Sequence, residues 1–173
     1  MTIDQFWAIV EETRDGFDPS LRDGNMDRQV QRFTESLGGL PPDEILQLAR
    51  IFRERMNEAY RHDLWAAAYV IAGGCSDDWF MNFRSWLISM GRKAYEAAIR
   101  DPEALVDIAD APGVEDVFFE EFQHIPRQVY EERIGQEMAD TGVEHPDSPA
   151  GEEWSEADLP GRLPKLWAKY GNR

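Results

Sequence analysis

The stretch GGCSDDWFMNFRSWLISMGR, residues 73–92, combines residue types that could do chemistry at close spacing. It holds the only cysteine of the chain, a serine, two adjacent carboxylates and an arginine among apolar neighbours, with a histidine shortly before it. Two carboxylates and a guanidinium can hold a polar ligand or transfer protons. The sequence therefore offers six candidate residues for a polar or ligand site: His62, Cys75, Ser76, Asp77, Asp78 and Arg84.

The same residues also have a purely structural explanation. Ser76 can cap a helix, and carboxylates in the first turn of that helix complement its dipole. A helical wheel places Arg84 inside the apolar arc, where an unpaired charge costs several kcal/mol. We therefore expect Arg84 to bond several carbonyls or a carboxylate, such as Asp63 or an acid from another helix. We favour this explanation because caps and satisfied buried ions are more common than active sites.

Other constellations with catalytic chemistry are not found in the sequence. The three histidines, His62, His124 and His145, lie far apart and form no HxxxH or HExxH pattern. There is no P-loop, GxGxxG or GxSxG motif. Cys75 is a weak candidate for a reactive thiol, because neighbouring aspartates oppose the effect of a helix N-terminus on its pKa. The sequence predicts no metal, no cofactor and no catalytic residue, and it favours a protein that is not an enzyme.

The elements that must position these residues are predicted to be helices. Apolar residues recur at helical spacing through most of the chain, and strand-like alternation is absent. We predict an all-α fold, an irregular bundle of about seven or eight helices in a single domain over residues 1–136. The expected helices cover residues 4–14, 27–37, 41–61, 63–72, 77–90, 92–100 and 102–109, with one or two more over 114–136, kinked near Pro126. Residues 64–72 are all apolar, so we expect this helix to be central and surrounded.

The end of the chain has a different composition. Residues 137–158 contain eight acidic residues, no lysine or arginine, and two prolines, which predicts a mobile or loosely docked acidic loop. Residues 159–173 should form a short helix that docks on the domain through Leu166, Trp167 and Tyr170. In the preceding region, we expect the stripe that includes Phe118 to be core and Phe119 to lie off it, either as an exposed contact or within a crowded core.

Charge limits the classes of partner. The net charge is −16, with −4 over residues 1–100 and −12 over residues 101–173. Nucleic acids and anionic membranes need clustered lysine and arginine, so neither is predicted as a direct partner. No apolar run is long enough to span a bilayer, and no signal peptide precedes the first helix. With one cysteine, these features predict a cytoplasmic protein, whose oligomeric state the sequence leaves open.

The pattern DLW–AAY–I–GGCSDD–F–FR–WLI–GR, with FWAIVEETR near the N-terminus, resembles the bacterial family known as domain of unknown function 4240. The resemblance covers residues 1 to about 135. It implies that eight residues match the pattern of the family: Gly74, Cys75, Ser76, Asp77, Asp78, Arg84, Trp86 and Gly91. It implies no activity for them. At Trp79 and Met81 the resemblance leads us to expect variation, so the apolar surface there is expected to be particular to this chain.

Two functional hypotheses follow from these observations. The first is a non-enzymatic protein–protein interaction module whose acidic surface binds a basic protein. It depends on the excess of negative charge and the helical scaffold. The alternative is an enzyme or small-molecule-binding protein with a polar site built from Asp77, Asp78 and Arg84. An acidic mimic of DNA has less support, because acids are not regularly spaced along one helix face.

Overall fold

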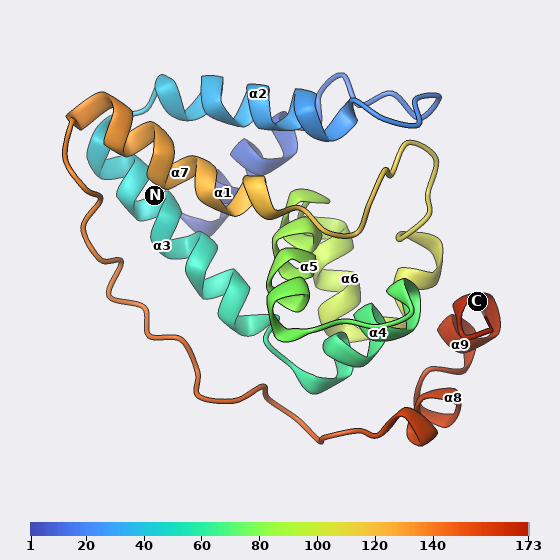
Figure 1. Cartoon of the computed structure of the whole chain (residues 1–173). Helices are drawn as coiled ribbons and strands as arrows, with labels where there is room; N and C mark the ends of the chain where they lie inside the picture. The colour runs from blue at the N-terminus through green and yellow to red at the C-terminus, as the bar shows by residue number, and fades with distance from the viewer. Residues whose placement is uncertain (173) are drawn as a thin grey trace.

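The structure is a computed structural model that describes residues 1–172 (Figure 1). The helices of its first part are α1 (Ile3–Glu12), α2 (Asn25–Gly38), α3 (Pro42–Glu58), α4 (His62–Ala72), α5 (Asp77–Ser89) and α6 (Arg92–Arg100). The remaining helices are η1 (Pro102–Asp107), α7 (Glu120–Ile134), η2 (Glu156–Asp158), α8 (Leu159–Arg162) and α9 (Pro164–Tyr170). No strand occurs within these residues, which confirms the predicted all-α fold. The C-terminal segment adds short helices to the expected number.

The ends of α4 and α5 follow from their sequence. Gly73 and Gly74 have positive φ angles of 71° and 139°, which side chains other than glycine rarely adopt, so the chain can leave α4 in a tight turn. Ser76 has an extended backbone, and its hydroxyl accepts a hydrogen bond from the N–H of Trp79 at 3.3 Å. This bond satisfies one of the free donors of the first turn. The predicted start of α5 is therefore confirmed.

Helix α5 is largely buried, and α7 packs on it with one face while its other face is exposed. Helix α7 packs against α2, α3 and α5, and the rings of Phe33 and Phe122 stack at 4.6 Å between α2 and α7 (Figure 1). All residues from Phe83 to Ser89 in α5 are buried. The prediction that α4 is fully surrounded is wrong, because Trp65 and Tyr69 are only partly buried. Helix α4 lies at one end of the molecule, where α9, η1 and α5 cover part of its surface (Figure 1).

The acidic segment, residues 137–158, runs along the outer edge of the molecule from the end of α7 to α8 and is helical only in its last residues, at η2 (Figure 1). The side-chain amide of Asn57 donates to the carbonyl of Glu144 at 2.8 Å. The N–H of Ala150 donates to the carbonyl of Tyr60, and the N–H of His62 donates to the carbonyl of Ala150, both at 2.9 Å. These bonds place the acidic segment beside the junction of α3 and α4.

The C-terminal helices pack on α4 and η1. Leu166 and Tyr170 of α9 are buried. The carboxylate of Glu103 in η1 accepts hydrogen bonds from the N–H groups of Lys165 and Leu166, at 2.9 and 3.2 Å, at the start of α9. A carboxylate there complements the helix dipole. Across residues 1–172, none of the helices has the length and apolar character needed to cross a membrane.

Candidate functional site

The first turn of α5 presents its carboxylates to solvent. Ser76, Asp77, Asp78 and Trp79 are all exposed. Trp65 of α4 fixes the backbone just before this turn, because its indole N–H donates to the carbonyl of Cys75 at 2.9 Å. The charged and aromatic side chains of this turn are therefore accessible on a fixed backbone.

Arg84 lies two turns further on and is 2% exposed. Its guanidinium donates to the carbonyl of Met56 at 2.9 Å and to that of Phe80 at 3.4 Å, and it lies 4.6 Å from the ring centroid of Tyr60. Burial lowers its pKa to about 10, so it remains charged at neutral pH. The expected carbonyl partners are present, whereas Asp63 pairs with Arg61 instead. Arg84 thus joins the last turn of α3, where carbonyls lack helical partners, to α5.

Tyr60 connects Arg84 to the exposed turn and to the acidic segment. The hydroxyl of Tyr60 lies 3.5 Å from a carboxylate oxygen of Asp77. The ring of His145 packs against the ring of Tyr60, with 4.7 Å between the ring centroids. Burial, followed by the negative charge of Asp77, raises the pKa of Tyr60. Asp77 and Arg84 therefore share a neighbour, but Arg84 is enclosed by Tyr60 and Phe80 while Asp77 faces solvent.

Cys75 is partly buried beside this turn. Its thiol is 3.5 Å from the carbonyl of Ser76. Burial and, second, the charge of Asp77 raise the pKa of the thiol to about 12. Since the thiolate is the reactive form, Cys75 has the properties of a packing residue at neutral pH.

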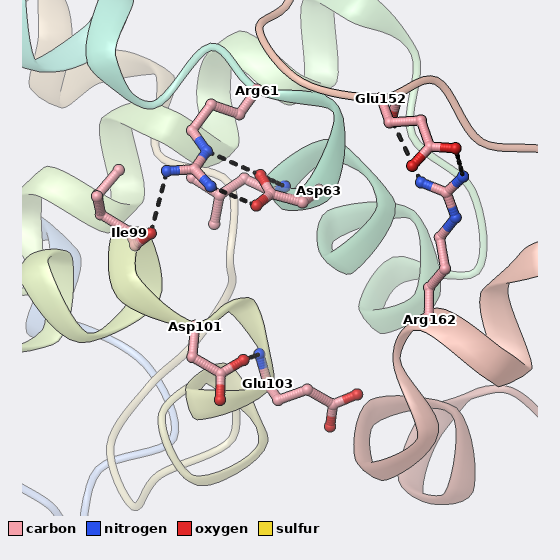
Figure 2. A network of polar contacts seen from close by, with 8 residues as sticks. Arg61, Asp63, Ile99, Asp101, Glu103, Glu152 and Arg162 are labelled. Carbon is pink, nitrogen blue, oxygen red and sulfur yellow. Dashed lines mark hydrogen bonds and ion pairs between the residues drawn. The ribbon is translucent and has the colours of Figure 1, made fainter.

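His62 lies at the start of α4, next to the network of Figure 2. In that network, the guanidinium of Arg61 forms a fork with the carboxylate of Asp63, at 2.9 and 2.5 Å, and reaches the carbonyl of Ile99 at 3.1 Å (Figure 2). The backbone of His62 bonds to the acidic segment. Among the described residues, no hydrogen bond, ion pair or ring contact links its side chain to α5. No group of three histidine, cysteine, aspartate or glutamate side chains within residues 1–172 is arranged to hold a metal ion.

A groove borders the exposed turn of α5. It has a volume of about 630 Å³ and is open to solvent. Its walls come from the end of α4, the start of α5, residues 109–118 and α9. The residues that line it are Ile71, Ala72, Gly74, Trp79, Ala109, Asp110, Val114, Glu115, Asp116, Val117, Phe118 and Tyr170. Trp79 is 52% exposed, and its ring meets that of Phe118 edge-to-face at 4.6 Å.

The rim of the groove is acidic. Asp110, Glu115 and Asp116 line it, and none of the lining residues is a lysine or arginine. Lys169 donates to Asp110 at 2.6 Å, and this bond lowers the pKa of the carboxyl. Glu115 accepts the N–H of Met26 at 2.7 Å. Hydrogen bonds thus hold Asp110 and Glu115 in place beside an apolar surface.

The role of Phe118 was missed in the sequence. Phe119, for which the sequence left open an exposed contact or a crowded core, is 2% exposed, while Phe118 is only partly buried and lines the groove. The helical spacing assumed for these residues is wrong, because α7 begins only at Glu120 and Phe119 is its non-helical N-cap, with φ −133° and ψ 76°. In this non-helical segment the side chains alternate, so Val117 and Phe119 are buried in the core while Phe118 between them stays partly exposed. The proline and glycine of DAPGVED were the signal for such a segment.

The fold and the site define a small all-α protein with an acidic-rimmed groove beside a capped helix. A comparison with family models matches residues 1–132 to the family described as "Protein of unknown function (DUF4240)". The chain belongs to this family, which confirms the resemblance found in the sequence. A search of curated proteins found no match, and neither did a search of solved structures.

Proposed function

We propose that this protein is a non-enzymatic interaction module that binds a basic segment of another protein in the groove beside α5. The observation that carries the proposal is Trp79, which is 52% exposed and forms an edge-to-face pair with Phe118 at 4.6 Å. Exposed aromatic residues in a concave apolar surface are typical anchors of protein interfaces. The turn that bears Trp79 is held by the Ser76 cap, so the anchor surface exists before binding.

The charge of the rim selects the chemistry of the partner. Asp110, Glu115 and Asp116 line the groove without a basic lining residue, and Asp78 is exposed next to Trp79. Residues 101–173 carry a net charge of −12, which attracts cations over a longer range. We expect the bound segment to carry an aliphatic or aromatic anchor flanked by lysine or arginine.

The polar-site alternative has less support from the geometry. Arg84 is enclosed in the core, whereas Asp77 and Asp78 face solvent. None of the three lines the groove or the cavity described below.

Selection of peptides from a random display library on the folded protein tests the proposal. We expect the selected peptides to be rich in lysine and arginine around an apolar anchor, and their affinity to fall with added salt. Trp79→Ala should weaken binding by at least about tenfold. Ile134→Ala is the matched control, because Ile134 is 38% exposed and lies on α7, outside the groove. Selected peptides without basic residues, or equal binding by the Trp79→Ala variant, would contradict the proposal.

A further inference from the structure

A second concave site lies between α3, α7 and the first residues of the acidic segment. It has a volume of about 460 Å³, within the range of small-molecule pockets. Helices α3 and α7 lie side by side at this point (Figure 1), and residues 137–141 form a further wall. The lining residues are Ala49, Phe52, Arg53, Met56, Met81, Gln123, His124, Pro126, Arg127, Glu137, Met138, Ala139, Asp140 and Thr141.

The cavity joins an apolar surface to a set of hydrogen-bond donors. Phe52, Met56 and Pro126 are buried and supply the apolar part. Arg53, His124 and Arg127 are exposed and line the same cavity. Within residues 1–172, the side chains of Arg53 and His124 make no hydrogen bond, ion pair or ring contact. Two donors therefore face the cavity without a protein partner, and a guanidinium is suited to bind a carboxylate through two parallel bonds.

Glu137 shows how a carboxylate can sit at this site. Its carboxylate lies 2.7 Å from one nitrogen of Arg127, while another nitrogen of Arg127 pairs with Glu131 at 2.7 Å. The side chain of Glu137 is 79% exposed, and such exposed pairs contribute little net free energy. A ligand carboxylate can replace Glu137 at small cost.

We propose that this cavity binds a small monocarboxylic acid with an apolar body. The carboxylate would lie between Arg53, His124 and Arg127, and the body would pack on Phe52 and Met56. A single negative charge is favoured over a polyanion because Glu137 and Asp140 also line the cavity and Glu131 already pairs with Arg127. This cavity is separate from the groove of the proposed function. Helix α5 contributes Met81 to the cavity and Trp79 to the groove.

The methionines of the chain provide a direct test. The chain has six methionines, of which Met56, Met81 and Met138 line the cavity, whereas Met1, Met26 and Met90 do not. The protein would be labelled at the methionine methyl groups and titrated with 4-phenylbutyrate and straight-chain monocarboxylates. We expect saturable NMR shifts at the three cavity methionines only. The alcohol 4-phenylbutanol and inorganic phosphate should bind at least about tenfold more weakly, since a charge-assisted bond is lost or a second charge is added.

Matched variants separate the site from a general effect on the protein. Arg53→Gln and Arg127→Gln should each weaken binding of 4-phenylbutyrate by about tenfold. Arg50→Gln is the control, because Arg50 is exposed on α3 and pairs with Glu54 outside the cavity. Glu137→Gln should tighten binding, since it removes the competing carboxylate. Shifts spread equally over all six methionines, no shifts with any monocarboxylate, or equal binding by Arg53→Gln and Arg50→Gln would overturn the proposal.

Discussion

The two halves of α5 carry charges in opposite ways. In the first turn, Asp77 and Asp78 are exposed and contribute through the helix dipole. Two turns later, Arg84 is 2% exposed and bonds to carbonyls of α3 and α5 between two aromatic rings. The same helix thus uses a buried charge to join elements and leaves exposed charges beside the groove. Adjacency in sequence therefore does not place these charged residues in a common site.

The largest expected effect is at Arg84. Arg84→Ala removes the packed side chain and leaves the carbonyl of Met56 without its donor, which should cost about 3–5 kcal/mol of unfolding free energy. For a chain of this size, each kcal/mol moves the melting temperature by roughly 2–4 °C. Thermal unfolding followed by circular dichroism measures the loss. Arg84→Met, which keeps the volume of the side chain, is the control and should lose less unfolding free energy. An Arg84→Ala variant as stable as the parent would contradict the contrast between the two halves of α5.

The second effect concerns the reactivity of Cys75. Because the pKa of the thiol is raised to about 12, alkylation at pH 8 should be at least about tenfold slower in the folded protein than in the unfolded chain. A tenfold difference in rate corresponds to about 1.4 kcal/mol. The folded-state rate should rise steadily as the pH rises toward 12, because the thiolate fraction grows. Equal rates in the folded and urea-unfolded protein would show that burial does not protect the thiol.

The N-cap of α5 should have an effect of middle size. Ser76→Ala removes the acceptor for the N–H of Trp79 and should cost about 1 kcal/mol, whereas Ser76→Asp should restore the cap. Melting temperatures of both variants test this. If Ser76→Ala left the melting temperature unchanged, the exposed turn would be held by other contacts.

The smallest effects are expected at the exposed carboxylates. Asp77→Asn and Asp78→Asn should each cost only about 0.3–1 kcal/mol, the size of a helix-dipole interaction. Added salt should reduce the difference between each variant and the parent. A loss at Asp77 as large as that at Arg84 would mean that Asp77, Tyr60 and Arg84 act as one buried network.

Local signals predicted much of the fold and part of the site. The Gly73–Gly74 stop, the Ser76 cap and the burial of Arg84 could be derived from residue types and spacing, because each depends on neighbours within a few residues. The partner of Arg84 could not be identified, because the carbonyl of Met56 comes from another helix and every residue has a carbonyl. Asp63 seemed suitable by charge, but Arg61 lies two residues away and takes it.

Long-range packing accounts for what the sequence did not predict. Residues 64–72 are apolar, but the position of α4 at one end of the molecule leaves Trp65 and Tyr69 partly exposed. The groove depends on four separate segments of the chain, so no single sequence window contains it. Its local signals, the proline and glycine of DAPGVED and the order Val117, Phe118 and Phe119, were hidden by the assumption of helical spacing.

The central claim is that the first turn of α5 serves binding while the rest of the helix serves stability. The most direct test measures, for Trp79→Ala, both the melting temperature and the affinity for a selected basic peptide. We predict a melting temperature within about 2 °C of the parent, as for most exposed substitutions, and an affinity at least about tenfold weaker. An unchanged affinity, or a melting temperature lowered as far as that of Arg84→Ala, would contradict this division of α5.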